Sequence, residues 1–230
     1  VWAEREARHF TVFVFVSMLA YSAQDLILEP FAGLAFGMTP GQSTQLAGVQ
    51  NSGVLCGMIM VALLATGVGG RRFGSLKTWT VLGCLGSAGA LFALALSGFH
   101  APSWPLHASV AALGFMNGMF AVAAIGSMME LAGKGSARRE GTRMGIWGAA
   151  QAIAFGSGGF IGALGVDAVR SIAGTPIAAY MTVFAIEGAI FIAAAWLALG
   201  IGQQRERDTS RTSDLMSLGE GMMPLREGKG

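Results

Sequence analysis

The chain consists of six long, mostly apolar segments separated by short polar or glycine-rich connections. A helix needs about 20 mostly apolar residues to cross the hydrocarbon core of a bilayer, and every segment is long enough. The short alternating strands of an outer-membrane barrel are not found in these segments. The pattern therefore predicts an all-α, polytopic membrane protein with six transmembrane helices, near residues 9–30, 43–67, 78–98, 105–130, 143–165 and 177–201.

Basic residues are concentrated on every second connection. Of the 15 Lys and Arg residues, all but Arg170 lie before the first segment, between the second and third, between the fourth and fifth, or after the sixth. Because cytoplasmic loops carry an excess of Lys and Arg, both termini are predicted to be cytoplasmic. Residues 1–202 would then form the transmembrane bundle, and residues 203–230 a polar cytoplasmic tail.

Composition supports a lipid environment. Hydrophobic residues make up 53% of the chain and charged residues only 12%, with a mean hydropathy of +0.57. A soluble domain carries about 25% charged residues, and a disordered chain would have the opposite composition. The net charge of +2 and the lack of basic patches interleaved with aromatic residues argue against a nucleic-acid partner.

Glycine is abundant, with 35 residues in the chain. Pairs of glycines four residues apart place two small residues on one helix face, where a second helix can approach closely. We expect close helix packing at four such pairs: Gly53 and Gly57, Gly114 and Gly118, Gly141 and Gly145, and Gly158 and Gly162.

A cluster of polar residues is predicted near the outer ends of the first two helices. Asp25 and Glu29 are four residues apart on one helix face, together with Ser22. Pro30 follows and is expected to bend or end the helix. The second helix returns through a similar depth with three polar residues, Gln45, Gln50 and Asn51. Three interpretations remain open: hydrogen bonding between the helices, a proton or substrate site, and contact with a pigment or partner subunit.

Glu187 is a candidate intramembrane acid, because it lies near the middle of the sixth predicted helix, where ionised groups are costly. The sequence offers no basic residue at that depth. Glu187 is therefore protonated, bonded to a polar neighbour such as Asn117 or Gln151, or paired with a part of the protein outside this chain. Glu130, by contrast, lies near a helix end and is expected to pair with Lys134.

No pattern of residues indicates an enzyme or a metal site. Catalytic Ser-His-Asp sets, phosphate-binding loops and metal-ligand spacings are missing from the sequence. The three histidines, His9, His100 and His107, lie at or near predicted helix ends and are interpreted as interfacial. Cys56 and Cys84 lie within predicted helices and are interpreted as buried, inert thiols.

One run of residues is more specific than composition. Residues 18–33 read Met-Leu-Ala-Tyr-Ser-Ala-Gln-Asp-Leu-Ile-Leu-Glu-Pro-Phe-Ala-Gly, followed by Phe-Gly-Met-Thr-Pro-Gly at 36–41, Thr-Gln-Leu at 44–46 and Gly-Val-Leu-Cys-Gly-Met at 53–58. This run resembles the PucC/LhaA family of phototrophic bacteria, and the resemblance covers about 200 of the 230 residues. The family motif falls on Ser22, Ala23, Gln24, Asp25, Glu29 and Pro30, which adds Gln24 to the candidate cluster.

The resemblance implies one half of a major-facilitator-like fold, the C-terminal six helices of a twelve-helix protein, in which the six spans are read as three plus three. The short basic loop at 67–74, with its Gly-Arg-Arg character, is similar to a signature of that superfamily. The implied function is a non-enzymatic assembly factor for light-harvesting antenna complexes in the bacterial inner, intracytoplasmic photosynthetic membrane. Its implied partners are antenna polypeptides and the missing N-terminal six-helix half, with bacteriochlorophyll as a candidate ligand. The alternatives are a proton-coupled or pigment-moving transporter and a resident subunit of a photosynthetic supercomplex.

Overall fold

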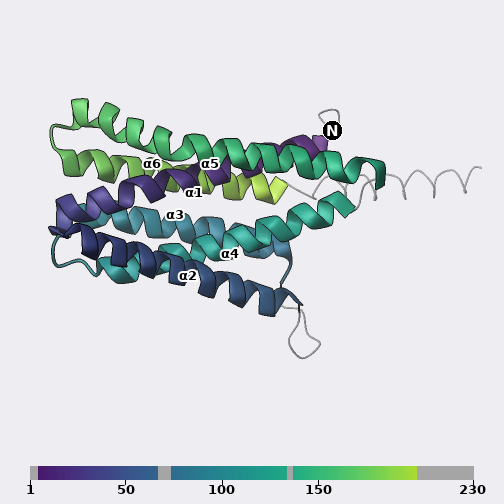
Figure 1. Ribbon diagram of the computed structural model, residues 1–230, viewed down its shortest axis with the longest axis horizontal. Coiled ribbons are helices and arrows are strands. Elements are labelled where there is room, and N and C mark those ends of the chain that lie inside the picture. Colours follow the sequence, from purple (N-terminus) through teal and green to yellow (C-terminus); the bar gives the residue numbers. More distant parts are fainter. Residues whose placement is uncertain (1–4, 67–73, 134–136, 201–230) are drawn as a thin grey trace, which may run out of the picture.

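The computed structural model describes residues 5–66, 74–133 and 137–200, which form six α-helices and, within those ranges, no strand (Figure 1). All six helices are long and apolar enough to cross a membrane. The predicted all-α, polytopic fold class is therefore confirmed. The helices are α1 Arg5–Phe36, α2 Pro40–Thr66, α3 Leu76–His100, α4 Leu106–Gly133, α5 Ala137–Ala173 and α6 Pro176–Gly200. The Gly-Arg-Arg loop and the 203–230 tail lie outside the described residues.

The first helix is longer than the sequence pattern indicates. α1 does not end at Pro30 but continues to Phe36. A proline inside a helix removes one backbone hydrogen bond, yet packing holds this segment in place, since the Phe31 ring lies 5.1 Å from that of Phe184 on α6. The helix ends instead at Phe36 and is followed by Gly37, whose φ of 66° is in the left-handed region that favours glycine.

The helices pack in a pattern that repeats between the two halves of the chain. The main packing partners are α2 with α4, α1 with α5, α3 with α4, α1 with α6, and α3 with α6. If α1, α2 and α3 are exchanged for α4, α5 and α6, the α2–α4 pair becomes the α1–α5 pair. The α3–α4 pair likewise becomes the α1–α6 pair, and the α3–α6 pair stays the same. The packing is therefore that of two related three-helix units, as the three-plus-three interpretation expects.

Glycines bring the two equivalent helix pairs into backbone contact. On α2, a Cβ added at Gly53 would lie 2.5 Å from the carbonyl oxygen of Ala111 on α4, and one at Gly57 would overlap the carbonyl oxygen of Phe115. On α5, a Cβ at Gly158 or Gly162 would lie 2.8 Å from a carbonyl oxygen of α1. Gly114 and Gly118 of α4 approach α2 in the same way. Close packing is thus confirmed for three of the four predicted glycine pairs.

The prediction for the fourth pair, Gly141 and Gly145, is wrong. A Cβ added at either position would meet no atom of the described structure within 4 Å. Among the described residues, the i,i+4 spacing of this pair is therefore not used for close helix packing.

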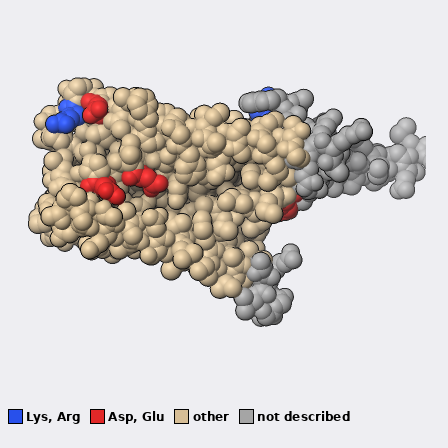
Figure 2. All heavy atoms as spheres, viewed as in Figure 1, with Lys and Arg blue, Asp and Glu red and all other residues tan. Residues whose placement is uncertain are grey.

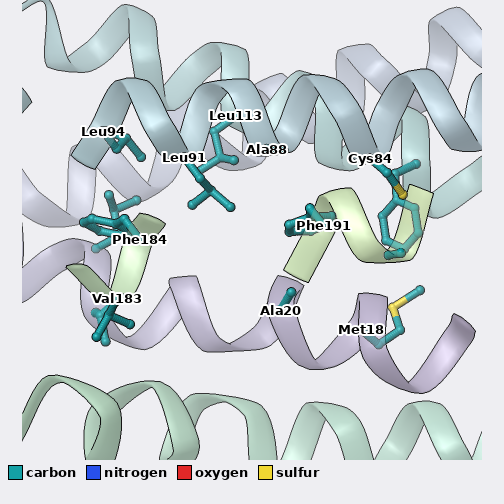
Figure 3. Packing of buried hydrophobic residues seen from close by; sticks show 14 of the residues in the cluster. Met18, Ala20, Cys84, Ala88, Leu91, Leu94, Leu113, Val183, Phe184 and Phe191 are labelled. Atoms are coloured by element: carbon teal, nitrogen blue, oxygen red, sulfur yellow. The ribbon is translucent and has the colours of Figure 1, made fainter. Parts of the chain in front are cut away.

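Aromatic rings fill the core in two layers. Toward the α1–α2 connection, Phe31 contacts Phe184. Toward the other end, the Phe120 ring lies 6.2 Å from Phe13 and 5.9 Å from Phe191. Figure 3 shows Leu91 and Ala88 of α3 and Ala20 of α1 along the stretch of core from Phe184 to Phe191.

The outer surface is mostly apolar. α3 and α6 expose large aliphatic side chains, including Leu82, Leu85, Ile186 and Ile192, as expected for helices that face lipid. Figure 2 shows one face that is almost free of charge except near its ends and in a hollow nearer the α1–α2 connection, where acidic side chains are visible.

Candidate functional site

The Asp25 side chain joins α1 to α2 through one hydrogen bond. Gln50 Nε2 donates to Asp25 Oδ1 over 2.9 Å. Gln50 is buried, whereas Asp25 is exposed on the surface of this chain. The two helices otherwise make only minor contact, so this bond is a main link between them. A carboxylate exposed at this depth is unfavourable in lipid, so a neighbouring protein surface or a water-filled space would suit it better.

The other members of the predicted cluster differ in their surroundings. Glu29 lies one turn beyond Asp25 and is half-buried, while Gln45 and Asn51 are exposed on α2. Ser22 points elsewhere, because its Oγ donates to the carbonyl oxygen of Phe155 on α5 over 2.9 Å. We call Asp25, Glu29, Gln45, Gln50 and Asn51 the α1–α2 polar face.

Gln24 lies on a different side of α1, which is buried in the bundle. Its side chain is fully buried in the core, and neither its Oε1 nor its Nε2 has a hydrogen-bond partner among the described residues. Sequence spacing grouped Gln24 with Asp25 because the two are adjacent in the motif. Adjacent residues on a helix are about 100° apart, so they face different surroundings.

Glu187 is buried on α6, with 2% of its surface exposed. Neither carboxylate oxygen has a hydrogen-bond partner in the described part of the chain, so no bond to Asn117 or Gln151 is formed. Asn117 instead accepts a hydrogen bond from Ser87 Oγ over 2.7 Å. This buried pair of α3 and α4 was not predicted, although a serine and an asparagine at core positions of apolar helices are the signal that would have indicated it.

The remaining candidates lie apart from these groups. His100 and His107 are exposed near helix ends and His9 is half-buried near the start of α1. No group of three or more His, Cys, Asp or Glu side chains in the described ranges is placed to hold a metal ion. Cys84 is buried as predicted, but Cys56 is exposed on α2, so that part of the prediction is wrong. Glu130 is exposed, and its predicted partner Lys134 lies outside the described residues.

These features define a polytopic α-helical membrane protein with polar groups on one helix face and in its core. The model of the PUCC protein family matches residues 1–206. The chain therefore belongs to the PUCC protein family, as the motif in the first helix implied.

Comparison with curated proteins gives relatives from two phototrophic bacteria. The chain is 53% identical over 201 residues to the "Bacteriochlorophyll synthase 44.5 kDa chain" of Rhodobacter capsulatus, which covers 87% of this chain and 46% of the relative. It is 31% identical to "Protein PucC" of Rhodobacter capsulatus over 180 residues, 76% of this chain and 37% of the relative. It is 30% identical to "Protein PucC" of Cereibacter sphaeroides over 197 residues, which are 83% of this chain and 41% of the relative.

The chain spans less than half the length of each of these relatives. No solved structure matches it. Family membership places the chain in the context of photosynthetic pigments and light-harvesting complexes.

Proposed function

We propose that this chain is part of a membrane assembly factor for bacterial light-harvesting complexes, and that its α1–α2 polar face engages antenna polypeptides. Family membership supports the general context. The observation that carries the proposal is Asp25, which is exposed at membrane depth and bonded to Gln50. An antenna polypeptide that crosses the membrane beside α1 and α2 would cover this carboxylate and offer it hydrogen-bond donors.

The remaining part of the protein would pack elsewhere, on the exposed surfaces of α2 and α5 outside the α1–α2 polar face. The chain spans less than half of its relatives, and we propose that the rest includes a six-helix N-terminal half of a major-facilitator-like fold. α2 and α5 are the helices with the least buried surface. Their exposed small residues, such as Gly48, Gly145 and Gly156, would allow close approach by further helices.

Bacteriochlorophyll enters this proposal as cargo rather than as a resident cofactor. A neutral imidazole is a suitable axial ligand for the magnesium of the pigment, but the three histidines of the chain lie near helix ends and not in the bundle interior. The described residues therefore do not favour a pigment held inside the bundle. Pigment would reach this protein with the antenna polypeptide, and we propose that the chain performs no catalysis on it.

The double variant Asp25→Asn, Glu29→Gln tests the proposal in cells of a phototrophic host. It is expected to lower the amount of assembled antenna complex, measured from the absorption spectrum of the membranes, while the variant protein is still inserted. Glu130→Gln is a matched control, because Glu130 is also an exposed acidic residue but lies at the other end of the bundle. Antenna levels equal to wild type in the double variant would make the polar face a structural feature only.

A proton-coupled or pigment-moving transporter is the second candidate, favoured by the buried acid Glu187. Under this alternative, Glu187→Gln abolishes flux into vesicles while antenna assembly persists. A resident supercomplex subunit would instead remain at fixed stoichiometry in mature complexes, whereas an assembly factor is released.

A further inference from the structure

Five polar atoms in the core have no hydrogen-bond partner among the described residues. They are Gln24 Nε2 and Oε1, Asn117 Nδ2, and Glu187 Oε1 and Oε2. Gln24 and Asn117 are 0% exposed and Glu187 is 2% exposed. Leaving a buried polar group without a partner is unfavourable, because the group loses its hydrogen bonds to water and gains none in return. Three such side chains on three helices therefore require a physical explanation.

Gln24 and Glu187 lie at the same level of the bundle. Figure 3 shows Ala20 of α1 at the level of Phe191 of α6. One turn toward the α1–α2 connection, about 6 Å along each helix, leads from Ala20 to Gln24 and from Phe191 to Glu187. α1 and α6 pack against each other, and both residues lie on the buried faces of their helices.

Asn117 approaches the same region from α4. It lies three residues before Phe120, whose ring contacts Phe191. Its partner Ser87 precedes Ala88, and the carbonyl oxygen of Ala88 lies 3.3 Å from the position of a Cβ on Gly188. The Ser87 hydroxyl donates to Asn117 Oδ1, which leaves both hydrogens of Asn117 Nδ2 to donate elsewhere.

The number of donors and acceptors depends on the protonation of Glu187. An ionised carboxylate can only accept hydrogen bonds, so it could not donate one to Gln24 Oε1. The negative charge of Glu187 would also stay buried, which is unfavourable. The Lys, Arg and His residues of the described ranges lie within about two turns of helix ends and supply no counter-charge at this depth. No two of these atoms are bonded to each other in the structure, but a change of side-chain rotamers would let a protonated carboxyl group donate to Gln24 Oε1 and accept at its carbonyl oxygen from Asn117 Nδ2.

We propose that Glu187, Gln24 and Asn117 form an occluded proton-binding site in the middle of the membrane. The Phe31–Phe184 contact closes the site toward the α1–α2 connection, and the Phe120–Phe191 contact closes it toward the other end. Asp25 of the α1–α2 polar face is an acidic group within electrostatic range of Glu187, whereas the test below follows the Glu187 carboxyl group itself and not antenna assembly.

Infrared spectroscopy of the purified protein in lipid nanodiscs at neutral pH tests this site. The expected result is a carbonyl stretch of a protonated carboxylic acid that moves when glutamate is labelled with ¹³C and disappears in Glu187→Gln. The band is expected to remain in Glu29→Gln and Asp25→Asn, which remove the two acids of the α1–α2 polar face. The labelling experiment uses the wild-type chain and so needs no variant to fold.

Asn117→Leu tests the geometry of the site, with Gln50→Leu as a matched control, since Gln50 is also a buried amide but is bonded to Asp25. Loss of the donor at residue 117 is expected to shift the Glu187 band to higher frequency, because hydrogen bonding weakens a carbonyl bond, while Gln50→Leu leaves the band in place. The absence of a glutamate-dependent band in wild type, or a band that persists in Glu187→Gln, would overturn the proposal.

Discussion

At the residue scale, the direction of a side chain on its helix decides what it can bind. Asp25 meets Gln50 of α2, Ser22 meets the backbone of α5, and Gln24 enters the core. These three residues lie within one turn of α1. A single motif therefore serves two helix contacts and a buried site, and its members are separable by mutation.

Gln50→Leu is predicted to lower the free energy of unfolding by about 1 kcal/mol, since a hydrogen bond to a charged group contributes about 1.5–3 kcal/mol and the exposure of Asp25 reduces this. Thermal unfolding in detergent measures the change. Gln45→Leu is the matched control, because Gln45 is exposed on the same helix. Combining Gln50→Leu with Asp25→Asn should give less than the sum of the two single effects; strict additivity would show that the bond contributes nothing.

Sequence periodicity could predict that polar residues gather on α1 and α2, but not which neighbour each one meets. Ser22 and Asp25 are three residues apart, about 60° around the helix axis, and this offset is enough for them to face α5 and α2. The identity of the neighbouring helix depends on tertiary packing, which the local pattern does not contain. For the same reason, Glu187 could be recognised as unusual while its surroundings could not be derived.

At the element scale, backbone contact between helices explains the positions of the glycines. Gly114 and Gly118 of α4 meet the carbonyl oxygens of Gln50 and Val54 on α2. The i,i+4 spacing predicted such contacts, but the open surroundings of Gly145 show that spacing alone does not identify an interface.

Gly118→Ala is predicted to destabilise the protein by about 1–3 kcal/mol, because a forced core contact costs this much and the added Cβ would overlap the carbonyl oxygen of Val54. Thermal unfolding of the chain in detergent measures the loss. Gly145→Ala adds the same methyl group in open space and is expected to leave stability unchanged or slightly raised. Equal effects of the two variants would contradict the close α2–α4 packing.

At the scale of the whole molecule, the exposed surface is mostly apolar, with polar side chains on α1 and α2. α3 and α6 expose leucine and isoleucine, whereas the α1–α2 polar face exposes Asp25 and Asn51. The six helices, and the short connections between them, could be predicted from hydropathy because lipid requires a similar length of every span. The pairing of α2 with α4 and α1 with α5 could not, since lipid-facing and helix-facing positions are equally apolar.

Orientation gives a direct prediction at this scale. The excess of basic residues predicts that the α3–α4 connection faces the periplasm, and Ser103 is exposed there. In a variant with Cys56 and Cys84 replaced by serine, Ser103→Cys is expected to react with a membrane-impermeant thiol reagent added to intact cells. Reaction only after the cells are opened would invert the topology.

Site-specific photo-crosslinking tests the proposed engagement of antenna polypeptides most directly. A photoreactive amino acid is placed at Asn51, on the α1–α2 polar face, or at Leu85, on the exposed apolar surface of α3, in cells that are producing antenna complexes. We predict crosslinks to antenna polypeptides from position 51 and none above background from position 85. Equal yields from both positions, or no antenna product from position 51, would contradict the proposed function.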